Sequence, residues 1–275
     1  MKTSKIILIT KRVCNKLNTS NQKTIYYQIA NSVAVILTII INALTNILPF
    51  NEVTTGQVSD SYPNLFTSPG YVFSIWGVIY LLSIVFMIYQ VRPSQRENNY
   101  LKEIGSLYLV SAIMNISWLF LFHYSYGVSS IYFASVFVLL LLLLVLIMIY
   151  VKLRIGESRV PFYEKLAVHL PFSVYLSWIS LASIAGIASA LNILIPNISM
   201  TNQVFGTAIM IIVAVLQSSL MLFTRRDLAF VLVVIWALVG IAFKQIDTQL
   251  IFWTAISATL LLFMEIIYVF IIKKE

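Results

Sequence analysis

Eight apolar stretches, each about as long as a bilayer is thick, follow one another along this chain. A helix needs about 20 mainly apolar residues to cross the hydrocarbon layer. The stretches cover residues 27–49, 70–91, 105–123, 128–151, 166–191, 203–223, 227–243 and 250–272. With 60% hydrophobic and 10% charged residues, a soluble fold of this size could not bury its apolar surface. The sequence therefore predicts an integral membrane protein.

The apolar stretches have the character of helices. Inside a bilayer every backbone polar group needs an internal partner, which leaves helices and closed barrels as spanning structures. Continuous runs such as Leu139 to Leu144 lack the alternation of a barrel strand. Prolines and glycines fall between the stretches, as at Pro93, Gly156 and Pro161. We therefore predict an all-α, polytopic bundle of about eight transmembrane helices.

The basic residues alternate between the connections. Every Lys and Arg except Lys244 lies before the first stretch, after the second, fourth or sixth, or in the C-terminal tail. Positive charge marks cytoplasmic loops, so both termini are expected on the cytoplasmic side of the cell membrane. The basic residues that give the net charge of +8 are therefore interpreted as markers of membrane orientation and as contacts with anionic lipid heads. Nucleic acid is not an expected partner.

Two segments lie outside the apolar stretches. Residues 1–26 form a basic segment, expected in the cytoplasm, for which a short amphipathic surface helix and a disordered arm both remain open. The longest connection on the other side, residues 50–69, contains Glu52 and Asp60 but no basic residue. Connections of this length are often caps or lids, although many only join their neighbours.

Few ionisable residues occur within the predicted helices. His123 and His169 lie near opposite ends of their helices and so cannot share a metal. Glu265 lies in the last helix, where it could pair with Lys273 or Lys274 or take part in a proton relay. Because standard acid–base groups are scarce, we predict neither catalytic residues nor metal ligands, and an enzyme is the weakest of the functional hypotheses.

Three of the predicted helices carry an aromatic face. Residues spaced i, i+3 and i+7 lie on one side of a helix. The three faces consist of Phe73, Trp76 and Tyr80; Asn115, Trp118 and Phe122; and Tyr175, Trp178 and Ala182. Such rings either fill gaps between helices or line a pocket for a flat apolar molecule. The spacing alone leaves both interpretations open.

The same residues carry a resemblance to a known family. Residues 69–80 fit the pattern P-G-x-x-F-x-x-W-x-x-x-Y, residues 115–122 fit N-x-x-W-x-x-x-F, and residues 175–182 fit Y-L-x-W-x-x-x-A. Three such motifs in this order resemble the tryptophan-rich sensory protein family, also called TspO/MBR or translocator protein. The resemblance implies a five-helix TspO-like domain over residues 27–192, followed by three additional helices over residues 193–275.

The resemblance also implies a function. It points to a membrane binding or sensory protein for a flat hydrophobic ligand, a porphyrin or other tetrapyrrole or a sterol-like molecule, held under the 50–69 connection. The ligand-binding residues that it implies are Pro69, Gly70, Phe73, Trp76, Tyr80, Asn115, Trp118, Phe122, Tyr175 and Trp178. No covalent cofactor is expected, and porphyrin or haem is the candidate ligand. The alternative is a transporter of a hydrophobic or amphipathic small molecule. The expected partners are the lipid bilayer, this small molecule and a second copy of the chain in a homodimer.

The chain also departs from the family pattern. Val174 stands where the family usually has Pro, and Gly186 where an Asn is common. Family members end near the fifth helix, whereas this chain continues for three more. We therefore expect an extended, divergent member of the family, and we expect its function to reside in the first 192 residues.

Overall fold

The predicted all-helical bundle is confirmed. The computed structural model describes residues 2–48, 50–195 and 197–272, and every regular element within them is helical. The main helices are α1 (Lys2–Ile47), α3 (Ile75–Gln90), α5 (Leu107–Tyr124), α6 (Ser129–Lys152), α8 (Leu170–Leu194), α9 (Met200–Arg225), α10 (Leu228–Lys244) and α11 (Gln249–Ile267). With the short turns that extend α3, α8 and α11, all but α10 are long and apolar enough to cross a membrane. The chain is thus a multi-pass membrane protein.

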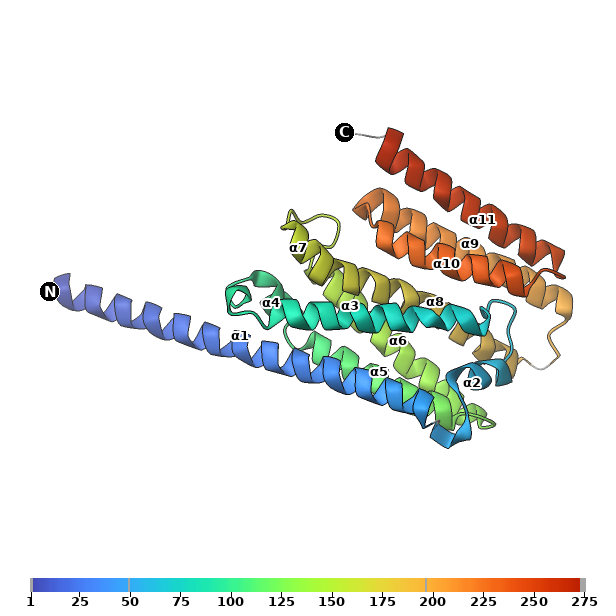
Figure 1. The fold of residues 1–275 in the computed structure, drawn as a ribbon, viewed down its shortest axis with the longest axis horizontal. Helices are drawn as coiled ribbons and strands as arrows, with labels where there is room; N and C mark the ends of the chain where they lie inside the picture. The colour runs from blue at the N-terminus through green and yellow to red at the C-terminus, as the bar shows by residue number, and fades with distance from the viewer. Residues whose placement is uncertain (1, 49, 196, 273–275) are drawn as a thin grey trace.

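The first helix is longer than the predicted span. The spacing predicted a helix over residues 27–49, but α1 runs without a break from Lys2 to Ile47. The basic N-terminal segment is therefore helical and continuous with the first span, and Figure 1 shows it projecting past the rest of the bundle. The amphipathic face expected for this segment depends on side chains that lie outside the described ones.

The connections lie alternately at the two ends of the bundle (Figure 1). One end carries η3 (Pro93–Gln95), α4 (Asn99–Ile104), α7 (Phe162–Glu164) and the π turn η4 (Lys165–His169), and η5 (Tyr268–Ile272) extends α11 toward that end. The opposite end carries η1 (Phe50–Glu52), α2 (Thr55–Ser61) and the start of η2 (Gly70–Ser74), which leads into α3. We call these the basic end and the α2 end, because the basic connections of the sequence fall at the first.

The 50–69 connection is an ordered cover and not a bare link. Its helix α2 begins with a capping box, in which Thr54 Oγ1 accepts a hydrogen bond from the Gln57 backbone and the Gln57 side chain accepts one from the Thr54 backbone. Such a box satisfies two backbone donors that would otherwise lack partners. Val58 of α2 is fully buried. It packs in one cluster with Tyr62, which follows α2, and with Tyr132 of α6, so α2 is packed onto the bundle.

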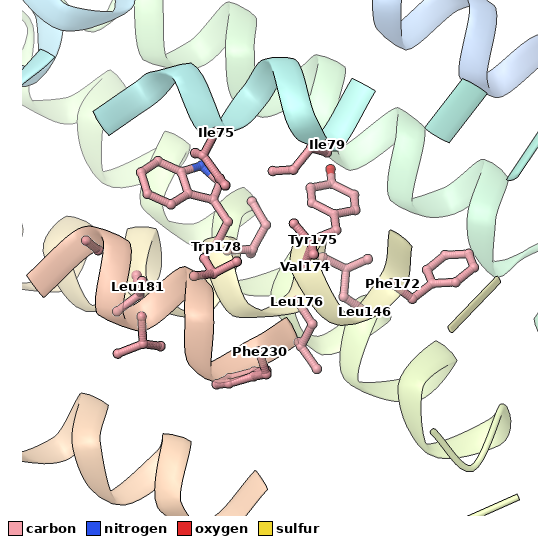
Figure 2. Close-up of a cluster of buried hydrophobic side chains, with 14 of the residues drawn as sticks. Ile75, Ile79, Leu146, Phe172, Val174, Tyr175, Leu176, Trp178, Leu181 and Phe230 are labelled. Atoms are coloured by element: carbon pink, nitrogen blue, oxygen red, sulfur yellow. The ribbon is translucent and has the colours of Figure 1, made fainter. Parts of the chain in front are cut away.

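Helix α8 forms the centre of the molecule. All of its residues from Pro171 to Leu181 are buried, between α3, α6 and α10. Figure 2 shows Tyr175 and Trp178 lying toward Ile79 and Ile75 of α3, with Phe230 of α10 on the other side of the helix. The small residues of α8 permit this close packing, as is common between membrane helices.

A buried carboxylate joins three helices at the basic end. Asp227 precedes α10 and accepts a hydrogen bond from the Phe230 backbone at 3.1 Å. The same carboxylate accepts the hydroxyls of Tyr150 in α6 at 2.7 Å and Ser173 in α8 at 2.5 Å. Because each oxygen of this buried group has donors, its burial is compensated, and α6, α8 and α10 are held together at that end.

Helix α10 also packs against the start of the second span. Trp236 Nε1 donates to the Val72 carbonyl at 3.1 Å, and at Gly240 an added Cβ would come closer than 3.0 Å to the Val72 side chain. The same Cβ would lie 3.3 Å from Pro69 Cδ. One of the three helices beyond residue 192 is therefore in direct contact with the first turn of the TspO-like motif in residues 69–80.

Candidate functional site

The three predicted aromatic faces meet around Trp76. The centroid of its ring lies 5.7 Å from Tyr80, 6.0 Å from Trp118, 6.2 Å from Tyr175 and 6.4 Å from Trp178. Ring pairs at 4.5–7 Å attract one another beyond the effect of burial. Residues of α3, α5 and α8 thus form one aromatic cluster, with Trp76 at its centre.

Two further predicted residues extend this cluster. Phe73 lies 5.8 Å from Trp178, and Phe122 lies 5.2 Å from Trp118. Seven of the ten residues proposed from the sequence are therefore in one connected group of rings. Whether they bind a ligand stays a prediction, since contact among rings is also what packing would produce.

The other three predicted residues have different surroundings. Asn115 is fully buried and its Oδ1 accepts a hydrogen bond from Asn42 Nδ2 of α1 at 3.1 Å. Pro69 packs beside Gly240 of α10. Gly70 borders a cavity described below. The Asn115 side chain therefore joins two helices, a role that the sequence analysis had left open.

A cavity lies beside the aromatic cluster, and we call it the central cavity. About 90 Å³ of it is open to the centres of water molecules. Its aromatic wall consists of Phe66, Phe73, Trp76, Trp118, Phe122, Tyr132 and Trp178. The rest of its wall comes from the 50–69 connection and from residues of α6, α8 and α10 that the sequence analysis did not propose.

Small residues of α8 make room for the central cavity. Ala182, Ala185, Gly186 and Ser189 line it, at the spacing of three or four residues that marks one helical face. At Gly186 an added Cβ would lie 3.5 Å from a Val136 methyl group, which is ordinary contact. The pattern of small residues was present in the sequence and could have indicated this wall.

The contribution of α10 had no such signal. Ala237 and Ile241 of this helix line the central cavity, and the Ala237 carbonyl accepts the Ser68 hydroxyl at 3.4 Å. Function was expected within the first 192 residues, but the wall of the cavity includes a helix beyond them. The reason is packing at long range, which no local pattern reports.

A second cavity lies on the other side of Trp76 and Trp118, and we call it the side cavity. Its volume is about 330 Å³, and its walls include Asn42 and Thr45 of α1 and Gly70 at the start of η2. Phe73, Trp76 and Trp118 line both cavities, and Tyr80 lines the side cavity. Phe73, Trp76 and Trp118 therefore stand between the central cavity and the side cavity. The Trp76 side chain is only half-buried there.

A polar groove leads from the α2 end to the central cavity. Its volume is about 560 Å³, and it shares Ser59, Asn64, Thr67 and Ser189 with the central cavity. Asn64 Nδ2 donates to Ser189 Oγ at 2.6 Å, and its Oδ1 accepts from the Phe66 backbone at 2.9 Å. The junction between groove and cavity is therefore built from small polar side chains.

One polar atom in the wall of the central cavity lacks a partner. The Nε1–H of Trp178 is buried with no acceptor among the described residues. Trp236 and Trp253 differ, because their Nε1–H groups donate to Val72 O and Gln249 Oε1 at 3.1 and 3.0 Å. An unpaired buried donor costs about 1–3 kcal/mol, a penalty that a hydrogen-bond acceptor brought within reach of Trp178 Nε1 would remove.

These features define a class, a helical membrane bundle with an aromatic-lined cavity beneath an ordered cover. A family model described as TSPO-like protein matches residues 28–268, and the chain therefore belongs to the TSPO-like family. The match includes α9, α10 and α11, so the family relation extends beyond the residues 27–192 that carry the motifs. No curated protein and no solved structure matches the chain. Membership supports a binding or sensory role in the membrane in general.

Proposed function

We propose that this protein binds a flat, apolar small molecule, a tetrapyrrole such as protoporphyrin or haem or a sterol-like molecule, against the rings around Trp76. The observation that carries the proposal is the cluster of seven aromatic rings that borders a cavity and contains an unpaired donor at Trp178. Aromatic faces stack on planar π-systems, and an indole N–H adds one directed hydrogen bond. These are the groups that a flat ligand with a few polar atoms requires.

The volumes suggest how such a ligand fits. Ligand pockets usually measure about 300–1,000 Å³, which is more than the central cavity holds in this conformation but within the range of the side cavity. Trp76 stands between the two. Under the proposal its half-buried side chain turns, and the two cavities join into one slot lined on both sides by rings.

Tryptophan fluorescence tests the proposal directly. Purified protein titrated with protoporphyrin should show saturable quenching, and Trp76→Phe and Trp178→Phe should each weaken the affinity. A ring pair contributes about 0.5–1.5 kcal/mol, so the dissociation constant should rise about two- to tenfold. Trp253→Phe is the matched control, because this side chain is 58% exposed and its helix α11 packs mainly on α9 and α10, which carry no ring of the cluster.

The result that would contradict binding at the cluster is equally clear. Quenching that rises linearly with ligand, or that changes as much in Trp253→Phe as in Trp76→Phe, would indicate partitioning into detergent or lipid. A sterol added as competitor separates the two ligand classes, because only a molecule that shares the slot displaces protoporphyrin.

We also propose that the basic end faces the cytoplasm of a cell membrane, with both termini on that side. Cys14 is the only cysteine of the chain, which makes a labelling experiment simple. A thiol reagent that cannot cross membranes should label Cys14 only after cell lysis. In a Cys14→Ser, Thr248→Cys variant it should label intact cells, since Thr248 lies at the α2 end. The opposite pattern would invert the orientation.

A further inference from the structure

Lys244 is an unusual residue for its position. It is the only Lys or Arg at the α2 end among the described residues, where the acidic residues are Glu52, Asp60 and Asp247. It is the last residue of α10 and lines the polar groove. A lone lysine on this side runs against the charge pattern of the rest of the chain, so its position calls for a local reason.

The ion pair that Lys244 makes is weak. Its Nζ lies 3.7 Å from Asp60 Oδ1, the side chain of Asp60 is 73% exposed, and that of Lys244 is 33% exposed. Exposed pairs of this kind contribute about 0–1 kcal/mol. A stronger or better-placed anion could therefore take the place of Asp60.

The groove and the central cavity run along the same helix faces. On α10, Ile241 lines the cavity and Lys244 lines the groove, one turn and about 4.5 Å apart along the axis. On α8, Ser189 lines both, and Asn192 lines the groove one turn further on. A molecule with its apolar body among the rings and a short acidic arm would thus reach Lys244.

We propose that Lys244 binds the carboxylate of the ligand, and that this protein takes a flat apolar molecule bearing an acidic arm. This inference rests on the proposed binding at the aromatic cluster and deepens it. The apolar body lies in the slot formed by the joined central and side cavities, the arm crosses the junction at Asn64 and Ser189, and the carboxylate displaces Asp60 from the lysine. Asp60 then serves as the counter-ion of Lys244 only while no ligand is bound.

Two probes with the same ring test this proposal. Protoporphyrin carries two carboxylates, and its dimethyl ester carries none. Lys244→Gln should weaken the diacid about ten- to a hundredfold, in line with the loss of one hydrogen bond to a charged group, and should leave the ester unchanged. Asp60→Asn should tighten the diacid about two- to threefold, because it removes the competing carboxylate.

The opposite signs of the two variants separate this role from a structural one. If the pair only fastened α2 to α10, both variants would change the affinity for acid and ester in the same direction, and the proposal would be wrong. Equal binding of acid and ester by the unmodified protein would also overturn it, while binding at the rings would stand. If neither probe gave saturable quenching, the failure would lie with the aromatic site itself.

A lipid phosphate is another source of negative charge for Lys244. Measurements in nanodiscs of zwitterionic lipid and of lipid containing phosphatidylglycerol distinguish it. The effect of Lys244→Gln on the diacid should be the same in both. An effect that appears only with the anionic lipid would assign the lysine to lipid headgroups and refute the ligand carboxylate.

Discussion

The substitution Gly240→Ala tests whether α10 is an integral part of the site. An added Cβ would come closer than 3.0 Å to Val72 Cγ2 and lie 3.3 Å from Pro69 Cδ. Val72 is fully buried, and Pro69 is a rigid ring at the start of η2, so neither neighbour can move without shifting the second span. Extra atoms in a packed interior typically cost about 1–3 kcal/mol.

A matched glycine isolates this effect from helix propensity. Alanine is favoured over glycine in a helix by about 0.8–1.0 kcal/mol, a gain that both Gly240→Ala and Gly206→Ala receive. At Gly206 in α9 an added Cβ meets nothing within 4 Å. The difference in unfolding free energy between the two variants should therefore be about 1–3 kcal/mol, with Gly240→Ala the less stable.

Thermal denaturation in detergent is the assay. On the scale for soluble chains of 150–250 residues, 1 kcal/mol corresponds to about 2–4 °C, so Gly240→Ala should melt about 2–12 °C below Gly206→Ala. The same variant should weaken protoporphyrin, because Ala237 and Ile241 in the same helix line the central cavity. Equal melting temperatures and unchanged affinity would show that α10 is not locked to η2 as described.

Two further substitutions test the basic end. Gly156→Ala should destabilise the protein more than Gly127→Ala in the same thermal assay. Both glycines have positive φ (83° and 75°), a conformation that costs alanine about 1–2 kcal/mol. Only at Gly156 would the added Cβ also overlap the Arg225 backbone. Equal losses would refute that close contact. Asp227→Ala should cost about 2–5 kcal/mol, because three donors lose their acceptor, and Asp227→Asn should cost about half as much; equal effects would mean that the charge and not the hydrogen bonds matters.

The fold was largely predictable because its signals are local. A run of apolar residues predicts a membrane span directly, and the i, i+3, i+7 spacing indicates which rings share a helix face, as for Phe73, Trp76 and Tyr80. The positions of α3, α5, α6 and α8 agree with the predicted spans to within a few residues. Contacts between these faces then follow from the need to bury them together in a bundle.

The remainder of the site depends on pairings that no local pattern reports. Asn115 needed a partner, and the sequence could not indicate whether it was a ligand or Asn42 of α1. Trp236 and Gly240 match no motif, and Val72, which both of them contact, lies 164 residues before Trp236 in the chain. Glu265 is similar: it accepts the Ser219 hydroxyl of α9 at 2.8 Å, a contact that sequence reasoning did not consider.

The two ends of the bundle differ in a way that bears on sensing and transport. The polar groove and the central cavity open toward the α2 end, where they share Ser59 and Asn64. At the basic end, Asp227 holds α6, α8 and α10 together through buried hydrogen bonds. A transport cycle needs access to its site from both sides in turn, which here would require these bonds to break. We therefore expect protoporphyrin to enter proteoliposomes no faster than it enters empty vesicles, while saturable binding remains intact. A flux that Asp227→Asn increases would instead establish a path through the basic end.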